Sequence, residues 1–332
     1  MQLQSIHDAD IAEKRVLLRV DFNVPFTDSG AIAEDSRIKA VVPTIVLLKQ
    51  KGAAHITLMT HVGRPEGKVD EALRTAPLFK YLSELTDTTG VEMLENLRFD
   101  AREEVNDVGF AQELASHGDV FVNDAFAVCH RAAASTVGVA AFLPAYAGLL
   151  VEKEVAHLSE ALMPPVGSVA IIGGAKLETK LPLIAQFSSL YTKVCVGGAL
   201  ANEYAPTAND TNVSLPSDGV PQHQGMLDIG PQTAAAWAEE IRRAPFVLWN
   251  GPVGMYEKPE YRHGTDTLAR AIAEGSCRAV LGGGDTDAAL AQFTFDSERV
   301  FISTGGGAML EFLANGGTLP ALEVLKNPKV KP

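Results

Sequence analysis

The stretch Ser303–Glu311, STGGGAMLE, places three consecutive glycines between an apolar run and a helical pattern. The run before it, Arg299–Ile302, has the β-branched and aromatic residues of a short buried strand. The pattern after it, Ala308–Ala314, predicts a helix. Glycines leave the backbone N–H groups bare at this junction, where the positive end of the helix dipole also favours a negative charge. The stretch therefore predicts a strand–loop–helix unit that binds an anion.

The same arrangement recurs in the second half of the chain. Each copy is a mostly apolar run that ends in glycines: Val169–Ile172 before Gly173-Gly174, Lys193–Val196 before Gly197-Gly198, and Ala279–Leu281 before Gly282–Gly284. One glycine-rich loop is a weak signal, but repetition at predicted strand ends indicates a shared anion-binding edge.

Strand and helix patterns alternate in both halves of the chain. In the first half the strands are predicted at Arg15–Val20, Ile56–Met59 and Asp119–Val122, and the helices at Arg37–Lys51, Thr75–Thr88 and Asn106–Ser116. The alternation restarts at Val169, after a predicted helix over 147–161. This pattern predicts an α/β fold with two doubly wound parallel-sheet domains joined by that helix. The segment 206–224 lacks periodicity and predicts a surface loop.

The composition excludes several classes of protein. The 332 residues are 46% hydrophobic and 21% charged, which is typical of a globular chain rather than a disordered one. A net charge of −13 argues against nucleic acid as a partner. Cys129, Cys195 and Cys277 are far apart, so we expect a reducing, cytoplasmic environment without a disulfide framework. No stretch has a signal-peptide or membrane-span pattern, so we expect no membrane association.

Polar and basic residues collect where the strands of the first half end. They are Asp21, Asn23, Arg37, His61, Arg64, Arg98, His130 and Arg131. The carboxyl ends of parallel strands share one edge of a sheet, and ligands of open α/β sheets bind there. Guanidinium groups bind phosphate and carboxylate bidentately. A lone arginine is more often a surface ion-pair partner, but arginines at successive loops predict a small ligand that carries both anionic groups.

The loops of the second half hold Lys176, Lys180 and Asp285 beside their glycines. A lysine in the first turn of a helix opposes the helix dipole, so Lys176 predicts a bound phosphate. Lys180, one turn later on the same face, is better explained as a solvated helix residue. Asp285 suits either a helix cap or a Mg²⁺ ligand. Together they indicate a nucleotide with Mg²⁺, and two anionic half-sites indicate a transfer between them.

Several familiar motifs are absent from the sequence. It has no G-x-x-x-x-G-K-[ST] stretch, so it is not a P-loop enzyme, and no G-x-G-x-x-G dinucleotide fingerprint. Its cysteines do not have zinc-site spacing. A dinucleotide oxidoreductase is therefore a weak alternative.

The sequence closely resembles the phosphoglycerate kinase family over nearly the whole chain. The matching stretches are, in order, Arg19–Pro25, Asp35–Ile38, His61–Pro65, Glu95–Phe99, Asn123–Phe126, His130-Arg131, Ala147–Glu154, Gly173–Lys176, Trp249–Gly254, Gly282–Thr286 and Ser303–Ala308. So many motifs in one order make the resemblance very specific.

The resemblance implies two Rossmann-like domains around a cleft. We expect a phosphoglycerate-binding domain over 1–147, a linking helix over 148–163 and a nucleotide-binding domain over 164–317. We also expect the C-terminal tail, 318–332, to return to the first domain. Monomer is the expected state.

The resemblance also implies the site residues and the reaction. Phosphoglycerate would be bound by Asp21, Asn23, Arg37, His61, Arg64, Arg98 and Arg131. The nucleotide would be surrounded by Gly173, Gly174, Lys176, Lys180, Gly197, Gly198, Asn250, Pro252, Glu257, Gly284, Asp285, Thr286 and the loop Gly305, Gly306 and Gly307. Asp285 would contact Mg²⁺. The expected activity is reversible phosphoryl transfer between 1,3-bisphosphoglycerate and Mg-ADP, giving 3-phosphoglycerate and ATP in glycolysis, with Arg37, Lys176 and Gly306 as catalytic groups.

The chain departs from the family pattern at three places. It is shorter than most members, with part of the difference between Tyr204 and Met226. Ala127–Cys129 stands where the family usually has Gly-Thr-Ala, and Thr179 replaces the usual Asp before Lys180. These departures motivate a second hypothesis, a nucleotide-binding scaffold that has lost catalysis, although Arg37, Lys176 and Asp285 are all present.

Overall fold

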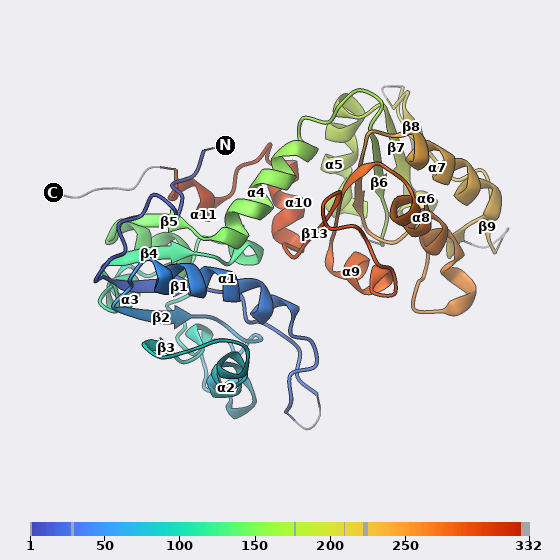
Figure 1. Cartoon of the computed structure of the whole chain (residues 1–332). Coiled ribbons are helices and arrows are strands. Elements are labelled where there is room, and N and C mark those ends of the chain that lie inside the picture. Colours follow the sequence, from blue (N-terminus) through green and yellow to red (C-terminus); the bar gives the residue numbers. More distant parts are fainter. Residues whose placement is uncertain (1, 28–29, 176, 209, 222–224, 327–332) are drawn as a thin grey trace. The chain divides into compact units, whose positions relative to one another are not determined.

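The computed structural model describes residues 2–27, 30–175, 177–208, 210–221 and 225–326 (Figure 1). The chain divides into two compact units. The first is Met1–Ala156 together with Thr318–Pro332, and the second is His157–Gly317. Lys176 and part of the tail, 327–332, lie outside the described residues, as do 209 and 222–224 of the predicted loop.

The first unit contains a parallel sheet with the strand order β3-β2-β1-β4-β5 in its described part. The strands are β1 (Arg15–Arg19), β2 (His55–Met59), β3 (Val91–Met93), β4 (Val120–Asn123) and β5 (Ala145–Ala147). In the register, Leu18 of β1 lies between Leu58 of β2 and Val122 of β4. All three side chains are fully buried, because helices cover both faces of a doubly wound sheet.

The helices of the first unit are α1 (Ser36–Gln50), α2 (Ala76–Leu85), α3 (Val108–Ala115) and α11 (Pro320–Glu323). The predicted start of α1 at Arg37 is wrong by one residue, and Pro43 lies inside the helix. Proline deprives the carbonyl of Lys39 of its helical partner, but Lys39 is exposed, so water can bind that carbonyl. Burial of Ile38, Val41 and Ile45 stabilises the helix despite this loss.

The helix α4 (Leu149–Ala161) has residues in both units, since the division falls between Ala156 and His157. Its first turn is held by Asp124 at the end of β4. The carboxylate Oδ1 of Asp124 accepts from the backbone N–H groups of Leu150 at 2.7 Å and Val151 at 3.3 Å. Asp124 therefore satisfies N–H groups that have no partner within the helix.

The second unit contains a parallel sheet with the strand order β13-β12-β11-β6-β7-β8 among its described residues. The strands are β6 (Val169–Ile172), β7 (Lys193–Val196), β8 (Val213–Ser214), β11 (Phe246–Asn250), β12 (Arg278–Gly282) and β13 (Val300–Ser303). Trp249, predicted as a core residue, is fully buried at the centre of this sheet.

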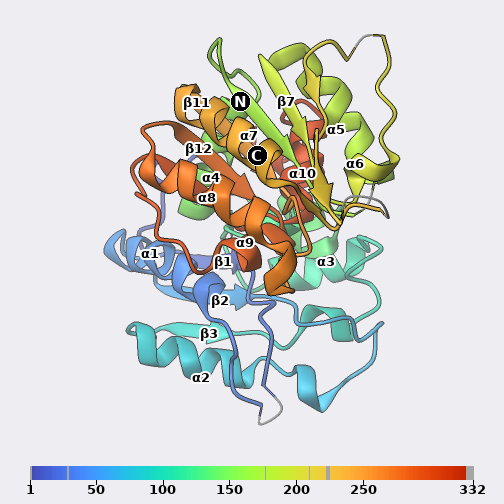
Figure 2. The same cartoon turned by 90° about the vertical axis from the view of Figure 1, so that its right-hand side faces the viewer.

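The helices of the second unit are α5 (Leu177–Leu190), α6 (Leu200–Glu203), α7 (Pro231–Arg243), α8 (His263–Glu274), α9 (Gly284–Leu290) and α10 (Gly307–Ala314). Figure 2 shows α7 and α8 side by side over the sheet. Trp237 of α7 and Leu268 of α8 pack with Trp249 in one apolar cluster.

The prediction of an unstructured loop over 206–224 is wrong in part. β8 adds to the edge of the sheet beside β7, and β9 (Gly219–Val220) pairs antiparallel with β10 (Asp228–Ile229). Each of these strands has only two residues, which is too short for any periodic pattern in the sequence.

The tail residues Thr318–Lys326 belong to the first unit. The N–H of Ala321 donates to the carbonyl of Cys129 at 3.1 Å, and the N–H of Gln4 donates to the carbonyl of Leu325 at 2.9 Å. No helix in the described ranges is long and apolar enough to cross a membrane.

Candidate active site

The polar edge of the first unit begins with a short ion pair after β1. Nη1 of Arg37 lies 2.6 Å from the Oδ2 atom of Asp21 and 3.4 Å from the carbonyl of Asn23. The Asn23 side chain accepts from the N–H of Gly63 at 2.9 Å, which joins this loop to the one that follows β2. Asp21 is buried, whereas the Arg37 side chain is 32% exposed and so remains accessible to a ligand.

His61 lies at the centre of the basic cluster. Its side chain is buried, and Nη2 of Arg19 lies 3.2 Å from its Nδ1 atom. Burial, followed by the charges of Arg19, Arg98, Arg131 and Arg37, lowers the pKa of His61 to about 2. The imidazole is therefore neutral at working pH, and the guanidinium groups are close enough to act on it electrostatically.

Arg98 and Arg131 share one counter-ion. The Oε1 atom of Glu104 lies 3.1 Å from Nη2 of Arg98 and 3.5 Å from Nη1 of Arg131. Arg98 also donates to the carbonyl of Gly63 at 2.8 Å. The structure therefore connects the loops after β2, β3 and β4, while Arg64 is exposed on the same His61–Pro65 loop.

Sequence reasoning missed the buried support behind this cluster. The guanidinium of Arg19 donates to Oγ of Ser135 at 2.9 Å, and Ser135 in turn donates to Oε1 of buried Glu103 at 2.5 Å. Arg19 is itself only 2% exposed. The sequence did offer one signal for this support, a basic residue inside an apolar strand. A buried arginine needs hydrogen-bond or ion-pair partners.

In the second unit, the sheet reverses its winding between β11 and β6. The loops after these strands approach closely: a side chain on Gly173 would lie 2.2 Å from the carbonyl oxygen of Pro252. The N–H of Gly173 donates to the carbonyl of Asn250, and the N–H of Gly174 to that of Pro252, both at 2.8 Å. Glycine is required here for packing, and the crevice beside such a reversal is where open α/β sheets bind ligands.

One pocket lies at this reversal and has a volume of about 670 Å³. Its lining brings together the predicted residues Gly173, Gly174, Lys180, Asn250, Asp285, Thr286, Gly306 and Gly307. A side chain on Gly306 or Gly307 would meet open space, so the start of α10 is accessible to an anion. Burial lowers the pKa of Lys180 to about 8, with the charge of Asp285 opposing that effect.

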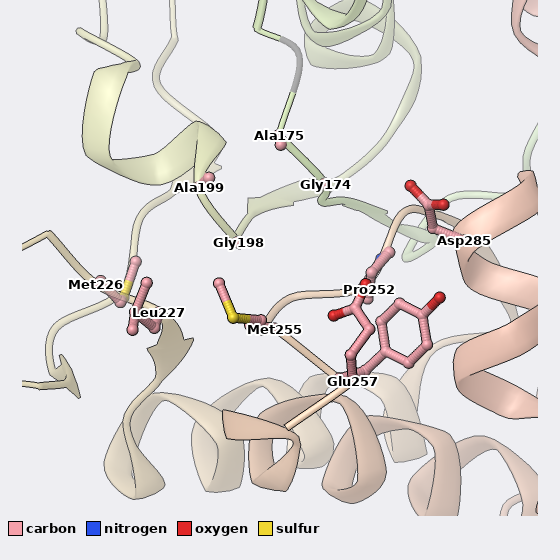
Figure 3. Close-up of a pocket in the computed structure, with 12 residues that line it drawn as sticks. Gly174, Ala175, Gly198, Ala199, Met226, Leu227, Pro252, Met255, Glu257 and Asp285 are labelled. Atoms are coloured by element: carbon pink, nitrogen blue, oxygen red, sulfur yellow. The ribbon is translucent and has the colours of Figure 1, made fainter. Parts of the chain in front are cut away.

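A second pocket, of about 580 Å³, adjoins the first through Gly174 and Asp285 (Figure 3). Predicted residues Gly198, Pro252 and Glu257 line it. Sequence reasoning missed its apolar side, formed by Met226, Leu227, Met255 and Tyr256. Figure 3 shows Met226 and Leu227 at the opposite side of the pocket from the Asp285 carboxylate. An apolar end and a charged end suit a base and a phosphate chain.

Some predicted nucleotide residues have structural contacts of their own. The Thr286 hydroxyl accepts from the N–H of Gly251 at 2.7 Å and donates to the carbonyl of Gly282 at 3.0 Å. The Asn250 amide donates to the same carbonyl at 2.7 Å, while its Oδ1 atom is buried without a partner in the described part of the chain. Gly197 and Gly305 are not among the described lining residues of either pocket.

The two pockets offer few protein ligands for Mg²⁺. Among the described residues no three His, Cys, Asp or Glu side chains are grouped as metal ligands. Asp285 is an exposed carboxylate at the point where both pockets meet. Asn250 also lines one pocket, although its unpartnered oxygen is buried. Mg²⁺ in nucleotide sites is usually held by one or two carboxylates together with substrate phosphates. The residues fit that mode rather than a closed protein cage.

Comparison with known proteins agrees with this geometry. The family model described as phosphoglycerate kinase matches residues 6–92, 86–214 and 204–316. A phosphoglycerate kinase of Pelotomaculum thermopropionicum is 38% identical over 394 aligned residues, covering 98% of this chain and 99% of the relative. One of Moorella thermoacetica is 39% identical over 389 residues, covering 97% and 98%. The structure of phosphoglycerate kinase from Coxiella burnetii matches with a TM-score of 0.87 at 32% identity, covering 98% of this chain and 99% of that one.

Proposed function

The chain belongs to the phosphoglycerate kinase family, and we propose which of its residues perform the reaction of that family. The enzyme transfers a phosphoryl group reversibly between 1,3-bisphosphoglycerate and ADP, giving 3-phosphoglycerate and ATP, a step of glycolysis. This chain has 332 residues, and its alignment with the Pelotomaculum relative spans 394 positions. The alignment therefore contains gaps in this chain.

The first unit binds phosphoglycerate through its basic edge. Arg37 is joined to the Gly63 loop through Asn23, and Arg98 donates to the carbonyl of Gly63 directly. Arg131 meets Arg98 at Glu104. This convergence is the single observation that carries the assignment. Arg64 completes the set from an exposed position. Asp21 and Asn23 hold Arg37 and the Gly63 loop in place and remain within reach of a bound hydroxyl group.

The second unit binds the nucleotide across the two adjoining pockets. The base occupies the apolar side formed by Met226, Leu227 and Met255, and the phosphates extend toward Lys180 and Gly306. Asp285 would hold Mg²⁺, which would supply charge neutralisation on the phosphates when bound. Lys176, outside the described residues, is assigned to the transferred phosphoryl group from its motif alone.

The chemistry needs no general base. In the direction that consumes ATP, the carboxylate of 3-phosphoglycerate attacks the γ-phosphorus and the bond to the β-phosphate oxygen breaks. That carboxylate is ionised at neutral pH, so no proton is removed. The protein has to align the reactants in line and neutralise the charge on the transferred group. Arg37, Lys176 and the Gly306 amide are assigned to that task.

A coupled assay with ATP and 3-phosphoglycerate tests these assignments. Arg37→Ala should lower turnover by about 10²-fold or more, because loss of one such donor costs about 2.7–4 kcal/mol of barrier. Arg15→Ala is the matched control: Arg15 is also paired with an aspartate, Asp119, but at the opposite end of β1. Near-normal turnover of Arg37→Ala would remove Arg37 from the mechanism.

The same assay separates the alternatives. A scaffold without catalysis would bind ADP but give no turnover, and an oxidoreductase would require a nicotinamide cofactor. Small molecules are the proposed partners, with no nucleic acid and no membrane, and a cytoplasmic monomer is the proposed state. Size-exclusion chromatography with light scattering tests the last point.

A further inference from the structure

Asp228 has a buried carboxyl group that lies close to the nucleotide pocket but does not line it. It lies on β10 next to Met226 and Leu227, is only 1% exposed, and is not among the pocket-lining residues. Its Oδ2 atom accepts from the N–H of Gly264 at 2.9 Å. Its Oδ1 atom is buried without a hydrogen-bond partner in the described residues. A carboxylate held in this way needs an explanation, because burial of charge is costly.

Asp228 supplies the cap that α8 lacks locally. Arg262 occupies the cap position of α8 without a capping side-chain bond, and its guanidinium instead pairs with Asp266 at 2.9 Å. The carboxylate of Asp228 comes from a different element and accepts from the second residue of the helix. It thereby ties the β9–β10 hairpin to the first turn of α8.

Two glycines fit closely around the same carboxyl group. A side chain on Gly254 would lie 2.1 Å from Oδ1 of Asp228, and one on Gly264 would lie 2.5 Å from it. Asp228 also forms an isolated antiparallel bridge with Gly254. The N–H of Met255 donates to the carbonyl of Leu227 at 2.8 Å. Asp228 therefore sets the spacing between the hairpin and the loop that begins at Gly254.

That spacing is the width of the apolar side of the nucleotide pocket. Met226 and Leu227 line the pocket from the hairpin, and Met255, Tyr256 and Glu257 line it from the loop. We propose that Asp228 is a positioning residue for nucleotide binding, which holds these two walls at the separation that the base requires. This inference rests on the proposed nucleotide site in the second unit.

The electrostatics of Asp228 agree with this role. Burial, and less strongly the charge of Asp266, raise its pKa, while the N–H groups of Gly264, Ile229 and His263 lower it; together they leave the pKa at about 6. The group is therefore ionised at neutral pH and held by helix-terminal amides rather than by a neighbouring cation.

Asp218 offers a matched control for the test. It lies next to β9 in the same unit, and its carboxylate caps α7 by accepting from the N–H groups of Gln232 at 2.9 Å and Thr233 at 2.8 Å. It does not line the nucleotide pocket. Asp228→Ala and Asp218→Ala thus each remove a capping carboxylate, but only the first removes the contact with Gly254.

The Michaelis constants for ATP and 3-phosphoglycerate should be measured together with Tm. Asp228→Ala should raise the KM for ATP by about tenfold and leave that for 3-phosphoglycerate within about twofold, because misplaced walls weaken one ligand only. Asp228→Asn, which restores an acceptor for Gly264, should recover most of the loss. Asp218→Ala should lower Tm without changing either KM.

Asp228 has no positioning role if its Ala variant binds ATP normally or if Asp218→Ala weakens ATP binding equally. Should Asp228→Ala fail to fold, Gly264→Ala perturbs the same contact, since its methyl group would meet Cγ1 of Ile229 at 2.3 Å and Oδ1 of Asp228 at 2.5 Å. Unchanged ATP binding in that variant would overturn the role. Calorimetric titration with Mg-ADP gives the same comparison without turnover. If the proposed reaction itself is wrong, the unaltered protein will bind Mg-ADP but show no turnover. That result differs from a failure of the Asp228 proposal, which concerns only the variants.

Discussion

Nη2 of Arg19 lies 3.2 Å from Nδ1 of His61, and both side chains are buried. A guanidinium group can only donate, so Nδ1 of His61 must be the acceptor. The proton of the neutral ring is therefore on Nε2. Arg19 thus fixes the tautomer that presents an N–H donor, which is the form that binds an anion without a change in protonation.

Nitrogen-15 NMR of the His61 ring checks this tautomer. Because the pKa of His61 is lowered to about 2, its ring signals should stay constant from about pH 5.5 to 8, with the proton on Nε2. Arg19→Gln should release the constraint and raise the pKa of the ring. A His61 signal in the unaltered protein that moves over this pH range would contradict the assignment.

Glu104 should compete with the substrate for two arginines. One carboxylate oxygen lies 3.1 Å from Arg98 and 3.5 Å from Arg131. Glu104 and Arg131 are exposed, whereas the Arg98 side chain is buried. Exposed pairs contribute about 0.2–1 kcal/mol, and on that scale Glu104→Gln should lower the KM for 3-phosphoglycerate by up to about fivefold. Steady-state kinetics at fixed, saturating ATP measure the change.

Glu113→Gln is the control for that experiment. Glu113 is another exposed carboxylate of the first unit, but it pairs with Arg102 at 2.7 Å and, within the described part of the chain, with none of the proposed substrate residues. It should leave the KM unchanged. A higher KM in Glu104→Gln would mean that Glu104 orients the arginines for binding instead of competing with the ligand.

The sequence predicted the sheets and their glycine-rich edge well, for a physical reason. The apolar runs and the glycines that end them are local signals, and Gly173, Gly174, Gly306 and Gly307 do line one pocket. Parallel winding then places successive strand ends at one edge. The α/β fold with two parallel sheets is therefore confirmed. The roles of the individual residues stay predictions.

The parts that were missed depend on contacts between distant segments. Ser135 lies 116 residues from Arg19, and the Ser135–Glu103 bond spans 32 residues, so the polar chain behind His61 has no local pattern. Met226 and Leu227 precede a two-residue strand, and distant segments hold them at the pocket. The side chain of Asn202 bonds to the backbone of Met226, and the N–H of Met255 donates to the carbonyl of Leu227. Neither residue propensity nor hydrophobic periodicity in the sequence predicts such contacts between distant segments.

Asp124 should make the stability of the protein depend on pH. Burial raises its pKa to about 6, above the value of about 3.9 expected in an unfolded chain. The folded state therefore binds this proton more tightly. The associated stability is fully present below about pH 4 and is lost as the pH rises through about 6. The difference amounts to about 3 kcal/mol at full ionisation, since one pKa unit corresponds to about 1.4 kcal/mol.

Asp124→Asn isolates this contribution, because the amide is neutral at every pH and still offers an acceptor to the first turn of α4. The difference in Tm between Asp124→Asn and the unaltered protein should shift in favour of the variant between about pH 4 and pH 8. Differential scanning calorimetry in matched buffers measures it. A difference that does not change with pH would show that Asp124 keeps an ordinary pKa.

Lys180 should make nucleotide binding depend on pH between about pH 7 and pH 9, through the loss of its positive charge. Its side chain is buried, and burial lowers its pKa to about 8. Below that pH the ammonium group is charged and attracts phosphate, and above it the group becomes neutral. The affinity for Mg-ADP should therefore fall as the pH rises from about 7 to 9, by up to about tenfold for the loss of one charge-assisted contact.

Lys180→Arg separates this effect from the titration of the nucleotide, which is the same for both proteins. Arginine keeps its charge throughout the range, so the variant should lose the part of the pH dependence that belongs to Lys180. Calorimetric titration with Mg-ADP at several pH values measures both proteins. If the two curves are parallel, Lys180 does not contact the phosphates, and its buried ammonium group serves only to pair electrostatically with Asp285.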